Sequence, residues 1–387
     1  MTYEIHIPPT LLIGGGARKQ AGDIASRLGM RKALLVSDKY LEGAGVTAEI
    51  AASLRASGVE TFIFTDIERE PETADALGAA GLIKRHGLDS IVSVGGGSSI
   101  DTAKAASALA TNGGLMSDYM GVGKVSKPGL PHLAIPTTAG TGSEVTRVTI
   151  ITDKEKNIKM MCLDNAFMPA AAIVDFELSM SMPPALTSYV GIDALTHCIE
   201  AYVSAKANPV SDMFAEKAIR LISGSILGAY RSGADARFRS GMMEGATFAG
   251  IAFSNASVCA VHGMARPIGA YFGVAHGLSN AMLLPVVTER SIEGDPVRYA
   301  RIARMMGLDD FGLSDLELNE SLIRTLKELN KRMGIPGPAE YGIDRARYMS
   351  LLPEMAKAAI DSGSPGNNPK VFSLEEIIEL YREVYDG

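Results

Sequence analysis

Apolar and polar positions over the first 180 residues or so follow an alternation of short buried runs and helix-like stretches. The apolar runs predict strands at Leu11–Ile13, Ala33–Ser37, Glu60–Phe64, Ser90–Val94 and His132–Ile135, the last ending in Pro136. The stretches with helical spacing predict helices at Thr47–Ser57, at Thr73–His86 and after Ser99. Strands and helices that alternate at this spacing predict a mostly parallel sheet with helices on both faces.

Beyond Pro183 and Pro184 the pattern changes to long helical segments rich in Ala, Leu, Met and Ile. The predicted helices are Ala185–Ser204, Pro209–Arg231, Phe238–Val261, Ser279–Arg290 and Glu317–Met333. A last helix begins at a capping box formed by Ser373 and Glu376. We therefore expect an α/β domain over residues 1–180 and an all-helical domain over residues 181–387.

Length, composition and charge agree with such a protein and exclude several classes. The 387 residues favour two domains, and the 47% hydrophobic and 21% charged content is that of a folded globular chain. A net charge of −7 argues against nucleic acid or an anionic membrane surface as partner. The sequence has no membrane-length apolar run and no signal-peptide pattern at its start. Three scattered cysteines do not make a disulfide framework, so we expect a cytoplasmic protein.

Three glycine-rich segments could hold a phosphate group. Gly14–Gly16 follows one short strand, and a simple strand-to-helix turn is favoured there. Gly95–Ser98 leaves a strand and opens a helix, where glycines allow close approach and the helix N-terminus favours negative charge. This segment lacks the GxGxxG fingerprint, so on spacing alone a phosphate site and a plain turn are equally supported. Pro136–Glu144 also follows a strand, and its hydroxyls could bind phosphate or ribose or could cap a helix.

Asp38 stands at the end of a predicted strand. A carboxylate there can accept both hydroxyls of an adenosine ribose and would repel a 2′-phosphate. An N-cap for the next segment is an equal alternative.

Three of the six histidines fall in the helical half, beside an acidic residue that could share a metal ion with them. Asp193 and His197 are four residues apart, which places both on one face of a helix, although such a pair also arises by chance. His262 and His276 are each followed by Gly, and with Pro267 between them we expect the helix to break, so that the two converge only through the fold. One carboxylate and three imidazoles suit Fe²⁺ or Zn²⁺ rather than Ca²⁺. The alternative is a set of hydrogen-bonded core histidines.

These motifs and their order resemble the iron-containing (group III) alcohol dehydrogenase family over nearly the whole chain. The segments that carry the resemblance are Gly95–Lys104 (GGGSSIDTAK), Pro136–Glu144 (PTTAGTGSE), Gly191–Tyr202 (GIDALTHCIEAY), Val261–Ala265 (VHGMA) and His276–Gly277. The resemblance implies a dehydroquinate synthase-like architecture, with a dinucleotide-binding α/β domain, a helical domain and a metal in the cleft between them. It also implies a homodimer or a higher oligomer.

The resemblance also implies roles for individual residues. The metal ligands would be Asp193, His197, His262 and His276. The pyrophosphate of the cofactor would lie on Gly95, Gly96, Gly97 and Ser98, with Thr137, Thr138 and Thr141 lining the cofactor, Lys159 near the nicotinamide ribose and Asp38 at the adenosine ribose. Two residues depart from the family pattern. Glu70 stands where relatives often carry Asn, and Arg266 stands where many carry a second histidine.

The activity that the resemblance implies is NAD(H)-dependent interconversion of a small alcohol and its aldehyde. The metal would act as a Lewis acid on the substrate oxygen. One alternative is an NAD- and metal-dependent lyase of the dehydroquinate synthase type, but it should gather several Lys and Arg at the metal, where only Arg266 is evident. A non-catalytic metal or nucleotide sensor is disfavoured by a four-ligand set.

Arg266 leaves two hypotheses open. A guanidinium does not titrate near neutral pH, so it cannot relay a proton. It can hold a carboxylate, sulfonate or phosphonate tail on the substrate through paired hydrogen bonds. Alternatively, it turns outward and pairs with an acid such as Glu244.

Overall fold

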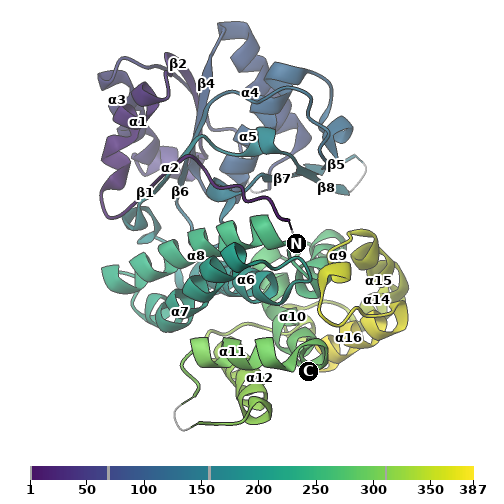
Figure 1. Cartoon of the computed structure of the whole chain (residues 1–387). Coiled ribbons are helices and arrows are strands. Elements are labelled where there is room, and N and C mark those ends of the chain that lie inside the picture. The colour runs from purple at the N-terminus through teal and green to yellow at the C-terminus, as the bar shows by residue number, and fades with distance from the viewer. Residues whose placement is uncertain (1, 68–69, 156–157, 310–311) are drawn as a thin grey trace. The chain divides into compact units, whose positions relative to one another are not determined.

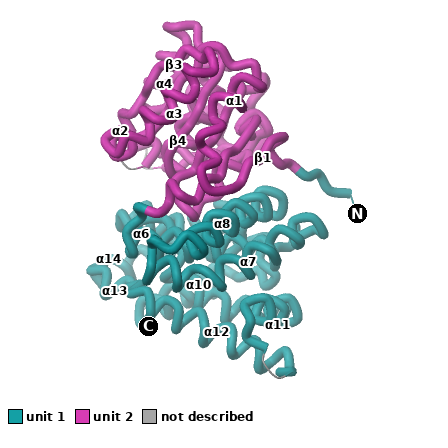
Figure 2. The backbone as a smooth tube through the Cα atoms, turned by 90° about the vertical axis from the view of Figure 1, so that its left-hand side faces the viewer, with its two compact units in different colours: residues 1–5, 181–387 teal, residues 6–180 magenta. Residues whose placement is uncertain are grey.

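The computed structural model describes residues 2–67, 70–155, 158–309 and 312–387. Its helices and strands follow the element order labelled in Figure 1. The chain divides into two compact units (Figure 2). The N-terminal unit is His6–Met180, and the C-terminal unit is Ser181–Gly387 together with Met1–Ile5.

A six-stranded parallel sheet forms the centre of the N-terminal unit. In spatial order the strands are β1 (Thr10–Ile13), β9 (Ala171–Val174), β6 (His132–Pro136), β4 (Ser90–Gly95), β2 (Lys32–Val36) and β3 (Glu60–Phe64). All residues of β4, β6 and β9 are buried, which explains why these strands are mostly apolar on both faces. The predicted parallel sheet is confirmed, and β9 is a strand that the sequence analysis did not anticipate.

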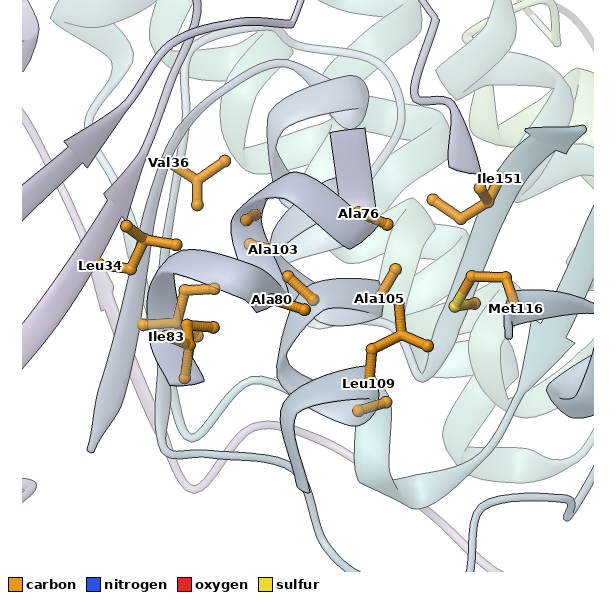
Figure 3. Close-up of a cluster of buried hydrophobic side chains, with 14 of the residues drawn as sticks. Leu34, Val36, Ala76, Ala80, Ile83, Ala103, Ala105, Leu109, Met116 and Ile151 are labelled. Atoms are coloured by element: carbon orange, nitrogen blue, oxygen red, sulfur yellow. The ribbon is translucent and has the colours of Figure 1, made fainter. Parts of the chain in front are cut away.

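Helices cover both faces of this sheet, because successive side chains of a strand point to opposite sides. On one face, Leu35 and Val94 pack with α1 (Ala21–Arg27) and α3 (Val46–Ala56) in one core cluster. On the other face, Leu34 and Val36 pack with alanines of α4 (Thr73–His86) and α5 (Gly97–Asn112), as Figure 3 shows. The alanines in this core lie at positions 76, 79 and 80 of α4 and at positions 103, 105, 106 and 108 of α5.

A second, three-stranded sheet packs beside α5. It consists of β5 (Gly121–Val122), β8 (Ile158–Leu163) and β7 (Val148–Asp153), with β7 and β8 antiparallel. Ile151, Met160 and Cys162 join the core that contains Leu34. The remaining helix of regular α type in this unit is α2 (Lys39–Gly43).

Only helices and connecting segments occur among the described residues of the C-terminal unit. They are α6 (Pro184–Val203), α7 (Pro209–Arg231), α8 (Ala236–Ala256), α9 (Ala260–Phe272), α10 (His276–Ser291), α11 (Pro296–Met305), α12 (Asp315–Arg332), α13 (Pro338–Tyr341), α14 (Arg345–Ser350), α15 (Leu352–Asp361) and α16 (Leu374–Asp386). The helices α6, α7 and α8 pack against one another, and α10 packs on α6 and α9 (Figure 1). The capping box of Ser373 and Glu376 starts α16 as predicted.

Two helix boundaries differ from the prediction. The single helix expected over Phe238–Val261 is two helices, α8 and α9, which meet at 103°. Ser257 between them has a φ of 70°, a left-handed conformation that ends α8. The helix does break between His262 and His276, as predicted, so the two histidines lie on α9 and α10. The break is not at Pro267, which lies inside α9, but after Phe272, where Gly273 caps the helix.

No single helix in the described ranges is long and apolar enough to cross a membrane. Only α8 and α9 taken together meet that criterion, and they form a bent pair.

Candidate metal and cofactor sites

Helix α6 presents three polar side chains on one face of an otherwise apolar helix. Asp193, His197 and Glu200 are spaced at four and then three residues, which aligns them along one side. All three are buried, Asp193 and Glu200 to 3% exposure each. Buried ionisable groups need partners, and these groups find theirs on α9 and α10.

Helix α10 begins with His276 and lies very close to α6. A Cβ at Gly277 would lie 2.5 Å from the backbone oxygen of Tyr189, so only glycine permits this approach. The close packing places Nε2 of His276 3.7 Å from Oδ1 of Asp193. The glycine after this histidine therefore serves to bring the two side chains together.

Helix α9 contributes His262, which is held from both sides by carboxylates. Its Nδ1 lies 2.6 Å from Oε2 of Glu200, and its Nε2 lies 3.5 Å from Oδ1 of Asp193. Glu200 also accepts hydrogen bonds from the backbone N–H groups of Cys259 and Val261, at 2.9 and 2.6 Å. A single carboxylate thus starts α9 and orients His262.

One donor atom from each of Asp193, His262 and His276 lies within 4.8 Å of the other two. His197 is adjacent but outside that set. Its ring stacks on His262 with centroids 4.3 Å apart, and on Phe253 of α8 at the same distance. The structure therefore gathers three of the four predicted ligands and places the fourth beside them.

The charges and hydrogen bonds of this cluster fit a divalent cation. When the imidazole of His262 is neutral and Glu200 accepts the proton on Nδ1, Nε2 carries the lone pair and faces Asp193. That buried nitrogen has no hydrogen-bond partner among the described residues. Burial lowers the pKa of His262, but Glu200 and Asp193 outweigh burial and raise the pKa to about 9. Burial raises the pKa of Asp193, and the neighbouring histidines more than reverse this and hold it below its ordinary value. Both shifts show that the cluster favours positive charge between these atoms.

Asn280 is a further site residue, which the sequence analysis did not single out. It lies on α10 one turn after His276 and is fully buried. Its Nδ2 donates to Oδ1 of Asp193 at 2.6 Å and lies 3.2 Å from Nε2 of His276. The amide therefore restrains the carboxylate that faces both histidines.

The predicted cofactor residues gather at the carboxyl ends of adjacent strands in the N-terminal unit. Asp38 follows β2, Gly95 ends β4 and Thr137 follows β6, and these three strands are neighbours in the sheet. After β2 the chain forms β3 on one side of β2 and then β4 on its other side. The order in which strands are added to the sheet therefore reverses between β2 and β4. Open α/β sheets bind ligands at such a switch point.

The glycine turn after β4 is shaped by close contacts. Gly95 has a φ of 156°, and a Cβ there would lie 2.3 Å from Oγ of Ser99. A Cβ at Gly97 would lie 3.0 Å from Cγ2 of Thr141, and one at Gly96 would lie 3.4 Å from side-chain atoms of Thr138. The N-cap residue of α5 is Gly96, which has no side chain of its own to cap the helix. The first backbone N–H groups of α5, including that of Ser98, therefore lie at a helix N-terminus suited to an anion.

Asp38 has the N-cap role that its sequence position suggested, and its second carboxylate oxygen is not used by that cap. Oδ1 accepts the N–H of Leu41 at 2.9 Å and so caps α2. Oδ2 lies 3.6 Å from the position that a Cβ would take at Gly95. One carboxylate oxygen thus caps the helix while the other faces the glycine turn.

Lys159 and Glu70, which the sequence analysis named separately, form an ion pair. Nζ of Lys159 donates to Oε1 of Glu70 at 2.8 Å. The lysine side chain is 22% exposed, so the pair lies near the surface of the N-terminal unit. Glu70, the residue that differs from the family pattern, thus supplies a carboxylate to Lys159.

Asp101 and Lys104 belong to a quoted motif but had no predicted role, and both bond to the hydroxyl of Ser143. Asp101 accepts from Oγ of Ser143 at 2.6 Å and from the N–H of Ile150 at 2.9 Å. Lys104 donates to Oγ of Ser143 at 3.0 Å and to the carbonyl oxygen of Val148 at 2.8 Å. Burial lowers the pKa of Lys104 to about 8. The pair ties α5 to the segment that follows Pro136–Glu144.

The first glycine segment is a plain turn, as its sequence context favoured. The N–H groups of Gly16 and Arg18 both donate to the carboxylate of Asp175, each at 3.1 Å. The carboxylate of Asp175 thus already accepts hydrogen bonds from the N–H groups that a phosphate would need.

Comparison with known proteins agrees with this geometry. The model described as "Iron-containing alcohol dehydrogenase" matches residues 8–176, and that described as "Fe-containing alcohol dehydrogenase family, C-terminal" matches residues 187–385. The chain belongs to the iron-containing alcohol dehydrogenase family. An NAD-dependent methanol dehydrogenase from Bacillus methanolicus is 38% identical over 97% of this chain and 98% of its own length.

Solved structures agree in fold over the full length. A 1,3-propanediol oxidoreductase superimposes with a TM-score of 0.95 and 35% identity, covering 100% of both chains. A sulfoacetaldehyde reductase from Bifidobacterium kashiwanohense, solved with NAD⁺, has a TM-score of 0.89 and 26% identity over 100% of this chain and 99% of its own. The protein is a metal-dependent alcohol dehydrogenase and aldehyde reductase that uses NAD(H) and Fe²⁺. This family membership selects the dehydrogenase over the lyase.

In this alcohol dehydrogenase Arg266 lies on α9, four residues after His262, and is half-buried. The predicted alternative, an outward side chain paired with Glu244, is not present. Within the described ranges no acidic side chain forms an ion pair with Arg266.

Proposed function

We propose that Asp193, His197, His262 and His276 hold Fe²⁺, with Zn²⁺ as the alternative ion. The observation that carries this proposal is the buried Nε2 of His262, which lies 3.5 Å from a carboxylate oxygen of Asp193 and has no hydrogen-bond partner among the described residues. Three donor atoms already lie within 4.8 Å of one another on three helices. A divalent metal bound there supplies Lewis acidity at the substrate oxygen, and NADH supplies the hydride.

Neighbouring side chains would prepare these ligands for the ion. Glu200 holds the Nδ1 proton of His262, which fixes the tautomer whose Nε2 is free to bind a metal. Asn280 fixes the carboxylate of Asp193 through a hydrogen bond to Oδ1. Because both partners are buried, they hold the two ligands in place before a metal arrives.

For the cofactor, we infer that the pyrophosphate lies on Gly95, Gly96, Gly97 and Ser98 and that Asp38 accepts the hydroxyls of the adenosine ribose. The position of these residues at the switch point of the sheet supports this assignment. Thr137, Thr138 and Thr141 would line the cofactor, and Lys159 would approach the nicotinamide ribose while paired with Glu70. An ionised Asp38 would favour NAD over NADP.

We further propose that the enzyme acts mainly as a reductase of small aldehydes when NADH is abundant, that it resides in the cytoplasm and that it forms a homodimer or a higher oligomer. The three cysteines are free and buried, which suits a reducing compartment. The relatives' names include methanol, 1,3-propanediol and sulfoacetaldehyde. These names cover neutral and anionic compounds alike, so residues of this chain must decide the substrate class.

Anaerobic purification followed by metal analysis and an aldehyde screen tests this function. We expect about one Fe²⁺ per chain and loss of NADH absorbance with short aldehydes. A variant with Ala at His276 should retain little metal. Tight binding of metal and NADH without net NADH oxidation by any aldehyde would contradict the proposal.

A further inference from the structure

Arg266 places an uncompensated positive charge beside the metal ligands. On α9 its side chain and that of His262 are four residues apart, so they share a face with Cβ atoms about 5–6 Å apart. Arg266 as a residue is half-buried, and the described residues provide its guanidinium with no ion-paired acid. A charge kept in this position without a partner of its own indicates a ligand that supplies one.

Burial lowers the pKa of Arg266, and the charge of Glu200 partly opposes this effect. The two oxygens of Glu200 are already occupied by Nδ1 of His262 and by the N–H groups of Cys259 and Val261. In the proposed loaded site a divalent ion is balanced by Asp193 and Glu200. The guanidinium then remains as net positive charge on the face of α9 that carries His262.

We propose that Arg266 binds the anionic tail of a small aldehyde substrate, namely a carboxylate, sulfonate or phosphonate. The inference rests on the proposed function, because it places the carbonyl end of the substrate at the metal ligands and the tail one helical turn away. A turn of about 5.4 Å corresponds to two or three carbon atoms between the two ends. The reaction remains reduction of an aldehyde to an alcohol by NADH with uptake of one proton, and the tail takes no part in the bond changes.

Steady-state kinetics with paired substrates test the specificity. Sulfoacetaldehyde and succinic semialdehyde represent anionic aldehydes, while propanal and butanal represent neutral ones. We expect the wild type to favour the anionic pair in kcat/KM by about 10-fold or more. Arg266→His, which restores the residue of many relatives, should lower kcat/KM for the anionic pair by about 10–100-fold and leave the neutral pair within about threefold. Arg266→Lys should retain part of the preference, because it keeps the charge but not the paired donors.

A binding measurement provides a readout that does not depend on turnover. Ethanesulfonate should bind the metal-free wild-type protein in calorimetry, with weaker binding in Arg266→His and at high salt. Metal content equal to wild type shows that each variant is folded. Equal preference for both substrate pairs in wild type and Arg266→His, with no ethanesulfonate binding, overturns this inference while neutral turnover keeps the proposed function intact. Absence of turnover with every aldehyde would instead overturn the proposed function.

Discussion

Replacing Glu200 should lower the affinity for the metal while every proposed metal ligand stays in the chain. Glu200→Gln removes the charge and leaves one oxygen for the three donors that the carboxylate now accepts. His262 then loses its fixed tautomer, so metal affinity should fall about 10–100-fold. Chelator competition on the purified protein measures this. The matched control is Glu244→Gln on α8, which should bind metal like the wild type. Affinity within about threefold of wild type in Glu200→Gln would refute the positioning role.

Asp38 should decide between NAD and NADP. Asp38→Asn keeps a side-chain oxygen for the N–H of Leu41 but removes the charge that repels a 2′-phosphate. We expect the ratio of kcat/KM for NADH to that for NADPH to fall in Asp38→Asn and in Asp38→Gly. Only the Gly variant should also lose the cap of α2. A ratio unchanged in both variants would show that Asp38 serves α2 alone.

Residues with distinctive chemistry could be predicted from the sequence, whereas residues with a supporting role could not. Histidines are rare in this chain, so the candidate ligands were easy to recognise in the sequence. Three of the four predicted ligands do lie together in the structure. Glu200 was part of a quoted motif, and its position seven residues after Asp193 on an apolar helix was the signal that could have identified it. Asn280 offered no such signal, because its function depends on how closely α10 packs on α6.

The contact between α6 and α10 is where helix packing controls the site. In Gly277→Ala the new methyl group would collide with the backbone oxygen of Tyr189, which cannot move as a side chain can. We expect α10 to shift, metal content to drop and the unfolding free energy to fall by about 1–3 kcal/mol.

Gly224→Ala is the matched control, since this helical glycine of α7 has no atom within 4 Å of a new Cβ. It should stabilise the protein by about 0.5–1 kcal/mol. Thermal melts and metal analysis of the two variants measure the contrast. Full metal content in Gly277→Ala would show that close helix packing is not needed for the site.

Elements were predictable where local pattern determines them and less so where distant residues do. Three of the five predicted strands of the large sheet, β2, β4 and β6, are buried, mostly apolar runs, whereas β1 and β3 are only partly buried. The hairpin of β7 and β8 is only half-buried, and β9 has just four residues, so their patterns were weak. The boundary between α8 and α9 depends on Glu200, whose carboxylate accepts the first N–H groups of α9 from another helix. The sequence around residue 257 contains no pattern from which that contact could be predicted.

At the scale of the whole molecule, the residues proposed to bind the metal and those proposed to bind the cofactor belong to different compact units. The proposed metal ligands all lie in the C-terminal unit, on α6, α9 and α10, while the proposed cofactor residues all lie in the N-terminal unit. The N-terminal unit has its own apolar core on both faces of its sheet. Ligand binding should therefore stabilise the two units separately.

Hydrogen exchange of the full chain can measure this separation. At a free metal concentration 100 times Kd, binding adds about 2.7 kcal/mol, which slows exchange through unfolding of the C-terminal unit by about 100-fold. We expect that protection in α6, α9 and α10 and little in β4 and α5, whereas NADH should protect β4 and α5. His276→Ala provides the control, because it should lose the effect of metal and keep the effect of NADH. Equal protection of β4 and α6 by metal alone would show that the two units unfold as one, and the separate assignment of metal and cofactor stability would then fail.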